Sequence, residues 1–134
     1  MIKKAVFLDR DGTINKEVDN LRRLSQLRVL PGAAEAIKKL NKLGFLVVAI
    51  TNQPVVSRGW ITEKKLDKIL AVLIKRLGRN GAKLDAIYYC PHHKDAQVKK
   101  YRILCKCRKP NIGLVIQAAK KFGINLFSLI LHGL

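Results

Sequence analysis

The sequence predicts an α/β domain with a mostly parallel sheet, because apolar runs typical of buried strands alternate with segments of helical periodicity. One of the strand-like runs is apolar at every position, as a strand covered by helices on both faces would be. The 134 residues are enough to bury a real core, so we expect one domain over residues 1–134.

The first predicted strand is 4–8, a short apolar run rich in strand-favouring residues, which an acidic turn ends. Apolar residues at helical spacing then predict a helix over 33–43, which Pro31-Gly32 opens. Residues 45–50 are apolar throughout and predict a second strand. We expect residues 51–59 to form a loop.

The second half of the chain continues the alternation. Apolar residues three or four apart predict a helix over 62–78, and residues 85–89 predict a third strand. A loop rich in Cys and His follows over 90–107, and then a helix over 110–122 and a strand over 126–131. Ligands bind at the carboxyl ends of parallel strands, so the loops after these strands are the places to look for function.

The charge balance is strongly basic, with 27 Lys and Arg against 9 Asp and Glu and a formal net charge of +18. This charge favours phosphate-bearing partners, from small phosphoesters to nucleic acid. The longest apolar run, 43–50, falls far short of the roughly 20 residues of a membrane-spanning helix. Because no signal-peptide pattern is present either, we expect a cytoplasmic protein without a membrane partner.

Two carboxylates, those of Asp9 and Asp11, stand two residues apart on the turn after the first strand. One carboxylate can attack phosphorus while a second carries a proton to the leaving group, and two together can hold Mg²⁺. A solvated acidic turn is the alternative interpretation of this short motif.

Polar residues also follow the second and third strands. Thr51, Asn52 and Gln53 offer a hydroxyl and amides that can hydrogen-bond phosphoryl oxygens. Arg108 and Lys109 precede the last predicted helix, where an ammonium beside a phosphoryl group would stabilise its charge. Taken alone, the first group is equally typical of a turn and the second of a basic surface.

All three cysteines lie in the loop over 90–107, in the sequences Cys90-Pro91-His92 and Cys105-Lys106-Cys107. Three thiolates and one imidazole can close a tetrahedral Zn²⁺ shell of the structural type. His93 competes with His92 for the fourth position, and buried reduced cysteines are the alternative to a metal site.

Residues 7–15, FLDRDGTIN, resemble motif I of the haloacid-dehalogenase-like (HAD) phosphatases. The later loops resemble the branch that contains D,D-heptose 1,7-bisphosphate phosphatase and the histidinol-phosphatase domain. The resemblance implies a HAD-like Rossmannoid three-layer fold and a Mg²⁺-dependent phosphomonoesterase acting on a small phosphorylated sugar or metabolite, heptose 1,7-bisphosphate first. It implies that Asp9 is the nucleophile and that Asp11 is the general acid and base, both of them on Mg²⁺.

The same resemblance assigns the remaining candidates. T-N-Q resembles motif II, with Thr51 on the phosphoryl group and Asn52 and Gln53 on the substrate. S-R-G-W and R-K-P resemble a substrate-holding run and motif III, so the resemblance implies that Arg58 and Arg108 bind substrate and Lys109 binds the phosphoryl group. C-P-H-H and C-x-C resemble the zinc loop of the branch, which selects His92 as the fourth ligand beside Cys90, Cys105 and Cys107. Family members commonly carry a Ser/Ala-Gly pair after T-N-Q, where this chain has Pro54-Val55-Val56.

The resemblance covers three of the family's four motifs. No Asp or Glu follows Asp95, so nothing in the sequence matches the acidic pair of motif IV, which completes the Mg²⁺ site. We expect a C-terminally incomplete chain, from a truncated or frame-shifted reading frame or an incomplete piece, with weakened Mg²⁺ binding and reduced activity.

Other functions are carried as alternatives. One is a histidinol-phosphate phosphatase, and another is an enzyme acting on a nucleic-acid 3′-phosphate. A third is a basic, zinc-containing nucleic-acid-binding module, which the cluster Lys99-Lys100-Tyr101-Arg102 would serve. The last is an inactive fragment of the family. We expect any nucleic-acid binding to be non-specific, and the intact family form to be a monomer.

Overall fold

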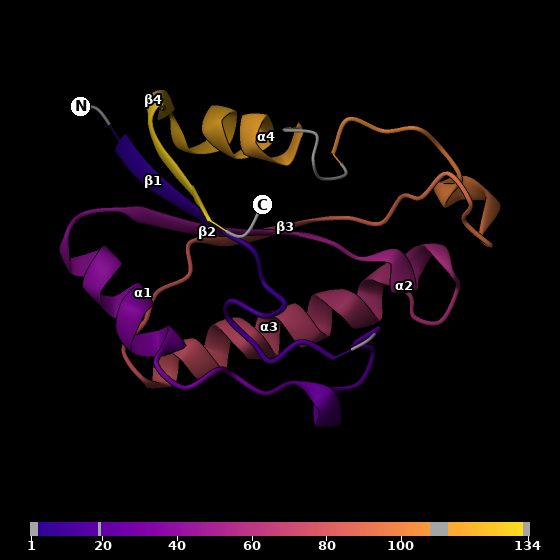
Figure 1. Ribbon diagram of the computed structural model, residues 1–134, viewed down its shortest axis with the longest axis horizontal. Coiled ribbons are helices and arrows are strands. Elements are labelled where there is room, and N and C mark those ends of the chain that lie inside the picture. Colours follow the sequence, from indigo (N-terminus) through magenta and orange to yellow (C-terminus); the bar gives the residue numbers. More distant parts are fainter. Residues whose placement is uncertain (1–2, 19, 108–112, 133–134) are drawn as a thin grey trace.

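The computed structural model describes residues 3–18, 20–107 and 113–132, which form one four-stranded parallel sheet with helices on both faces (Figure 1). The strand order is β3-β2-β1-β4. The strands are β1 (Lys3–Leu8), β2 (Leu46–Asn52), β3 (Ala86–Cys90) and β4 (Ile124–His132). The helices are α1 (Ala33–Lys42), α2 (Pro54–Ser57), α3 (Glu63–Arg79) and α4 (Gly113–Phe122), with short 3₁₀ turns at Leu24–Gln26 and Lys99–Tyr101. The predicted α/β fold with a parallel sheet is confirmed.

The sheet separates two apolar layers, because successive side chains of a strand point to opposite faces. Val6 and Leu8 of β1 pack in the layer that contains the buried residues of α1 and α3. Ala5 and Phe7 pack in the other layer, with the buried residues of α4. Figure 1 shows α1 and α3 on one side of the sheet and α4 on the other. The central strands are therefore covered on both faces, as their uninterrupted apolar sequence predicts.

Helix α3 shows how the sequence produces the local structure. The hydroxyl of Thr62 accepts a hydrogen bond from the amide of Lys65 at 3.2 Å and caps the first turn. Leu66, Leu73 and Leu77 then recur on one face, and all three are fully buried. This amphipathic face anchors the helix against the sheet.

The prediction of a loop over residues 51–59 is partly wrong. Strand β2 continues to Asn52, because its last two residues pair with Tyr89 and Cys90 of β3. Pro54 then occupies the first turn of the short helix α2, a position that suits its fixed φ. The predicted start of the last helix, at Pro110, lies outside the described residues, and the helix is described from Gly113. Within the described ranges, no helix combines the length and the apolar character needed to cross a membrane.

Candidate functional site

The polar residues that follow the strands gather at one edge of the sheet. Asp9 and Asp11 follow β1, while Thr51 and Asn52 are the last residues of β2. Cys90 is the last residue of β3 and pairs with Asn52. Because β1, β2 and β3 are parallel neighbours, their carboxyl ends bring the acidic turn, the T-N-Q loop and the Cys/His loop side by side.

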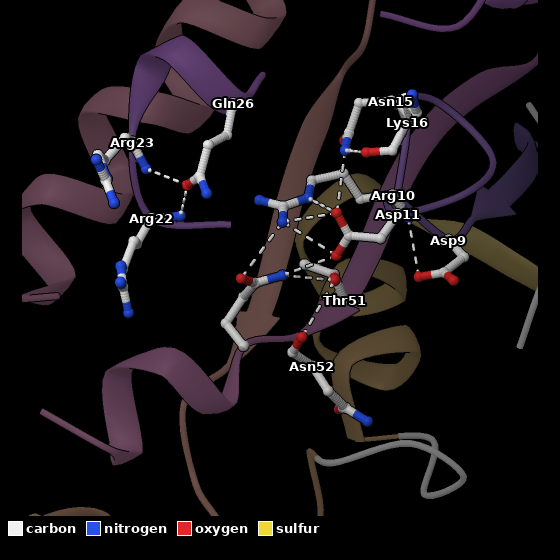
Figure 2. Close-up of polar contacts among 11 residues, drawn as sticks. Asp9, Arg10, Asp11, Asn15, Lys16, Arg22, Arg23, Gln26, Thr51 and Asn52 are labelled. Carbon is white, nitrogen blue, oxygen red and sulfur yellow. Dashed lines mark hydrogen bonds and ion pairs between the residues drawn. The ribbon is translucent and has the colours of Figure 1, made fainter. Parts of the chain in front are cut away.

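The acidic turn is organised around the side chain of Arg10, which is 1% exposed (Figure 2). Its Nε and Nη2 atoms donate to Oδ1 of Asp11 at 3.1 and 2.8 Å, and Nη2 also donates to Oδ2 at 3.0 Å. Asn15 donates a further hydrogen bond to Oδ1 of Asp11 at 3.0 Å. The Asp11 carboxylate is therefore held in one orientation by several donors.

The carboxylate of Asp9 lies to one side of the Arg10–Asp11 contacts (Figure 2). Its Oδ1 accepts a hydrogen bond from the backbone amide of Arg10 at 2.9 Å. The two carboxylates thus have different surroundings, although they are two residues apart in the sequence. Such a division suits two different chemical roles.

Gln53 joins the acidic turn to the end of β2. Its side chain is 3% exposed, and its Nε2 donates to the hydroxyl of Thr51 at 2.9 Å and to Oδ2 of Asp11 at 3.4 Å. Its Oε1 accepts from Nη2 of Arg10 at 3.4 Å. The structure thus brings the predicted residues Asp11, Thr51 and Gln53 into one hydrogen-bonded group.

A cavity of about 190 Å³ opens beside this group. Asp11 and Arg10 line it from the acidic turn, and Asn52 and Gln53 line it from the T-N-Q loop. Arg58 lies at its exposed side, where its guanidinium contacts the side-chain oxygen of Asn20. Four of the predicted site residues therefore face the same small polar cavity.

Arg58 also lies over an exposed aromatic ring. Its guanidinium carbon is 5.3 Å from the centre of the Trp60 ring, and that of Arg22 is 4.9 Å from the same ring. Cation–π contacts of this kind restrain long basic side chains without neutralising their charge. The Trp60 ring consequently restrains Arg58, which lines the cavity, and also holds a second guanidinium.

The Cys/His loop forms a compact group of metal-ligand atoms. Cys90, His92, Cys105 and Cys107 each place one donor atom within 4.8 Å of the others. Nδ1 of His92 lies 3.6 Å from Sγ of Cys90 and 3.4 Å from Sγ of Cys107. His93 is turned away, with its Nδ1 accepting from the amide of Asp95. Three thiols and one imidazole suit a closed tetrahedral metal site.

Burial raises the pKa of the Cys90 and Cys107 thiols in the metal-free protein, and the neighbouring thiol of Cys105 raises both further. Metal binding would therefore have to displace protons from this group.

Two tyrosines attach the Cys/His loop and β3 to helix α3. The hydroxyl of Tyr101 donates to Glu63 at 2.7 Å, and that of Tyr89 donates to Glu63 at 3.0 Å and to Asp67 at 3.1 Å. Sequence reasoning missed these contacts. It also missed the burial of Arg10, since nothing but its place between two acids distinguishes that residue from the other basic side chains.

The predicted residues Arg108 and Lys109 lie outside the described residues. Two described residues near that segment, Lys106 and Gly113, lie in close contact. The amide of Gly113 donates to the carbonyl oxygen of Lys106 at 2.9 Å, and a Cβ at position 113 would lie only 2.3 Å from that oxygen. Gly113 is therefore required where helix α4 begins against the Cys/His loop.

Comparison with known proteins gives a consistent result. No protein-family model matches the sequence. The chain is 38% identical over 124 residues to the D-glycero-β-D-manno-heptose-1,7-bisphosphate 7-phosphatase of Pasteurella multocida. This match covers 92% of this chain and 67% of that protein. The corresponding protein of Escherichia coli K12 is 36% identical over 122 residues, or 91% of this chain and 64% of that protein. The chain thus spans about two thirds of the length of the curated relatives it matches.

A solved structure is similar in fold as well as in sequence. The D,D-heptose 1,7-bisphosphate phosphatase from B. bronchiseptica, complexed with magnesium and phosphate, superposes with a TM-score of 0.78 at 32% identity. The match covers 92% of this chain and 65% of that one.

Proposed function

This chain belongs to the heptose-1,7-bisphosphate 7-phosphatase family of HAD-like phosphatases, and we propose that it hydrolyses the 7-phosphate of D-glycero-D-manno-heptose 1,7-bisphosphate. The family is one of hydrolases, and the predicted HAD-like fold is confirmed by the structural similarity. The relatives are phosphatases, so the nucleic-acid-binding alternative is not favoured. We infer a single domain over residues 1–134, since the four strands form one sheet.

In the proposed reaction, the carboxylate of Asp9 attacks phosphorus while the bond from phosphorus to the sugar oxygen breaks. Asp11 donates its proton to that oxygen, and the sugar leaves as an alcohol. Asp11, now a carboxylate, takes a proton from a water that attacks the aspartyl-phosphate. Inorganic phosphate is released and Asp9 is restored.

The other predicted residues bind the substrate in this proposal. Thr51 and Lys109 hold the transferring phosphoryl group, whose charge is the main obstacle to the reaction. Asn52, Gln53, Arg58 and Arg108 hold the rest of the substrate. The location of Asn52, Gln53 and Arg58 around one cavity with Asp11 supports this assignment for three of them.

The donor sets fit two metals. The Asp9 carboxylate and the Asp11 carbonyl would supply two hard oxygen ligands of the kind that Mg²⁺ prefers and would hold it beside the phosphate. Because no acidic pair of motif IV follows in the sequence, we expect this binding to be weak. When bound, Mg²⁺ would neutralise charge on the phosphoryl oxygens. The ligand group Cys90, His92, Cys105 and Cys107 has the soft, four-donor composition of a structural Zn²⁺ site.

We also propose that the protein acts as a monomer in the cytoplasm, on a free phosphorylated metabolite. The cysteine count supports this location, because three cysteines cannot all pair with one another in the disulfide framework of a secreted protein.

The observation that carries the proposal is the grouping of Asp9, Asp11 and Thr51 at the carboxyl ends of adjacent strands in a member of this family. The experiment measures phosphate release from heptose 1,7-bisphosphate with Mg²⁺ and with a chelator, for the unmodified protein and for Asp9→Asn. We expect Mg²⁺-dependent release that Asp9→Asn abolishes. Equal release by the two proteins would contradict the proposal.

A further inference from the structure

We propose that Arg10 is a positioning residue, which fixes the carboxylate of Asp11 for proton transfer and acts together with Gln53. The inference rests on the proposed function, because it deepens the role of Asp11 in that reaction. The residue would touch neither the transferring phosphoryl group nor the sugar oxygen. It would act through the carboxylate that it holds.

The burial of Arg10 is the first observation. The Arg10 side chain is 1% exposed, the side chain of its partner Asp11 is 25% exposed, and both residues line the cavity. The ion pair is therefore more deeply buried at Arg10 than at Asp11. Arg10 thus holds the Asp11 carboxylate from the protein interior, while Asp11 still lines the cavity.

The cost of this arrangement is the second observation. Nη1 of Arg10 is buried without a hydrogen-bond partner among the described residues. Burial of a charged group with an unpaired N–H opposes folding. A residue with only a structural task would be replaceable by an apolar side chain of similar volume, often without loss of stability. A functional task for the guanidinium accounts for the cost.

Gln53 provides the third observation. Its one amide group contacts Arg10, Asp11 and Thr51, and so connects the turn after β1 to the end of β2. Rotation of the Asp11 carboxylate would break hydrogen bonds to Arg10 and to Gln53 together. General acid catalysis requires the donor to lie within hydrogen-bond reach of the leaving oxygen, so this restraint has a direct catalytic use.

The chemistry of the leaving group makes the inference testable. A sugar alkoxide is a poor leaving group and needs a proton as the bond from phosphorus to oxygen breaks. The p-nitrophenolate ion is stable without a proton. Misplacing Asp11 should therefore slow hydrolysis of the sugar phosphate much more than aspartyl-phosphate formation from p-nitrophenyl phosphate.

The experiment compares Arg10→Met and Arg10→Lys on heptose 1,7-bisphosphate and on p-nitrophenyl phosphate, by steady-state and burst kinetics. For Arg10→Met we expect kcat on the sugar phosphate to fall by about 100-fold, with KM changed by less than about threefold. The burst rate on p-nitrophenyl phosphate should fall by less than about tenfold, and Arg10→Lys should restore part of the loss. The exposed Arg79→Met variant is the matched control and should change neither rate. Equal losses on both substrates, or no loss, would overturn the inference.

A second measurement tests the contact between Arg10 and Asp11 without relying on activity. It separates this inference from the proposed function, which would be contradicted if the unmodified chain hydrolysed neither substrate. Urea midpoints are measured for Asp11→Asn in the unmodified background and with Arg10→Met, or with Arg10→Lys if the Met variant does not fold. We expect the shift caused by Asp11→Asn to be at least halved when Arg10 is absent, because neighbouring residues couple. Equal shifts in the two backgrounds would overturn the inference.

Discussion

The backbone amide of Gln53 donates a hydrogen bond to the carbonyl oxygen of Cys90 at 2.9 Å. Gln53 belongs to the hydrogen-bonded group around Asp11, and Cys90 belongs to the group of metal-ligand atoms. The candidate phosphoryl site and the candidate zinc site are therefore joined through backbone at the ends of β2 and β3. A structural change at one of these sites should therefore alter the other.

Loss of the proposed zinc ion should destabilise the whole domain. Cys105→Ser removes one of the four candidate ligand atoms, and we expect zinc content to fall from about one ion per chain to near zero. The melting temperature should fall by about 10 °C or more, because the binding free energy of a structural zinc contributes to folding. Metal analysis and thermal unfolding measure the two effects.

The control for this variant is His93→Ala. His93 is adjacent to the proposed ligand His92, but its Nδ1 accepts a hydrogen bond from the Asp95 amide. We expect His93→Ala to retain its zinc. Full zinc content in Cys105→Ser, or loss of zinc in His93→Ala, would contradict the ligand set.

Two glycines give an opposed pair of stability predictions. Gly113→Ala would place a Cβ 2.3 Å from the Lys106 carbonyl oxygen, so we expect a loss of about 2–3 kcal/mol in the free energy of unfolding. Gly78 lies within helix α3 with no atom near its Cβ position, so Gly78→Ala should gain up to about 1 kcal/mol. Urea unfolding measures the free energy of unfolding of both variants. A Gly113→Ala variant as stable as the unmodified protein would show that the loop at Lys106 can move to make room for the Cβ.

Much of the fold is predictable from the sequence, since the apolar runs of the strands and the periodicity of α1 and α3 reflect burial directly. The grouping of Asp11, Thr51 and Gln53 follows from one rule, that parallel strands end at the same edge of the sheet. Helix α2 was missed because four residues are too few to show a helical period.

The contacts of Arg10 and Glu63 were not predictable for another reason. A charged residue in a turn is normally solvated, and only the tertiary structure shows that Arg10 is buried. Glu63 accepts hydrogen bonds from Tyr89 and Tyr101, which lie 26 and 38 positions away in the sequence. No local sequence pattern indicates such a contact. Long-range polar contacts of this kind depend on how the finished layers pack.

Stability should fall at alkaline pH. Burial raises the pKa of Tyr89 above its usual 10.0, and hydrogen bonds to Glu63 and Asp67 raise it further. Above about pH 10 the unfolded chain loses the phenol proton while the folded chain keeps it, so the free energy of unfolding decreases as pH rises.

The Tyr89→Phe variant tests this relation. We expect its urea midpoint to fall less between about pH 9 and about pH 11 than that of the unmodified protein. The burial of Cys90 produces a similar decline from its usual pKa of 9.0 in metal-free protein, so both proteins are compared with zinc bound. Parallel declines would show that Tyr89 does not keep its proton in the folded state.

Arg58 should affect substrate binding more than turnover. It lines the cavity beside Asp11, and Trp60 restrains its guanidinium. We expect Arg58→Met to raise KM for heptose 1,7-bisphosphate by about tenfold and to change kcat by less than about threefold. The exposed Arg23→Met variant is the control, and an unchanged KM in Arg58→Met would remove Arg58 from the site.

The central claim is that the Asp9 side chain forms a bond to phosphorus. The most direct measurement is an acid quench during turnover, followed by peptide mass analysis of the unmodified protein and of Asp9→Asn. We predict one phosphoryl group on the peptide that contains Asp9, lost on mild alkaline treatment and absent from Asp9→Asn. Phosphate release that continues in Asp9→Asn, with no such adduct in either protein, would contradict the account.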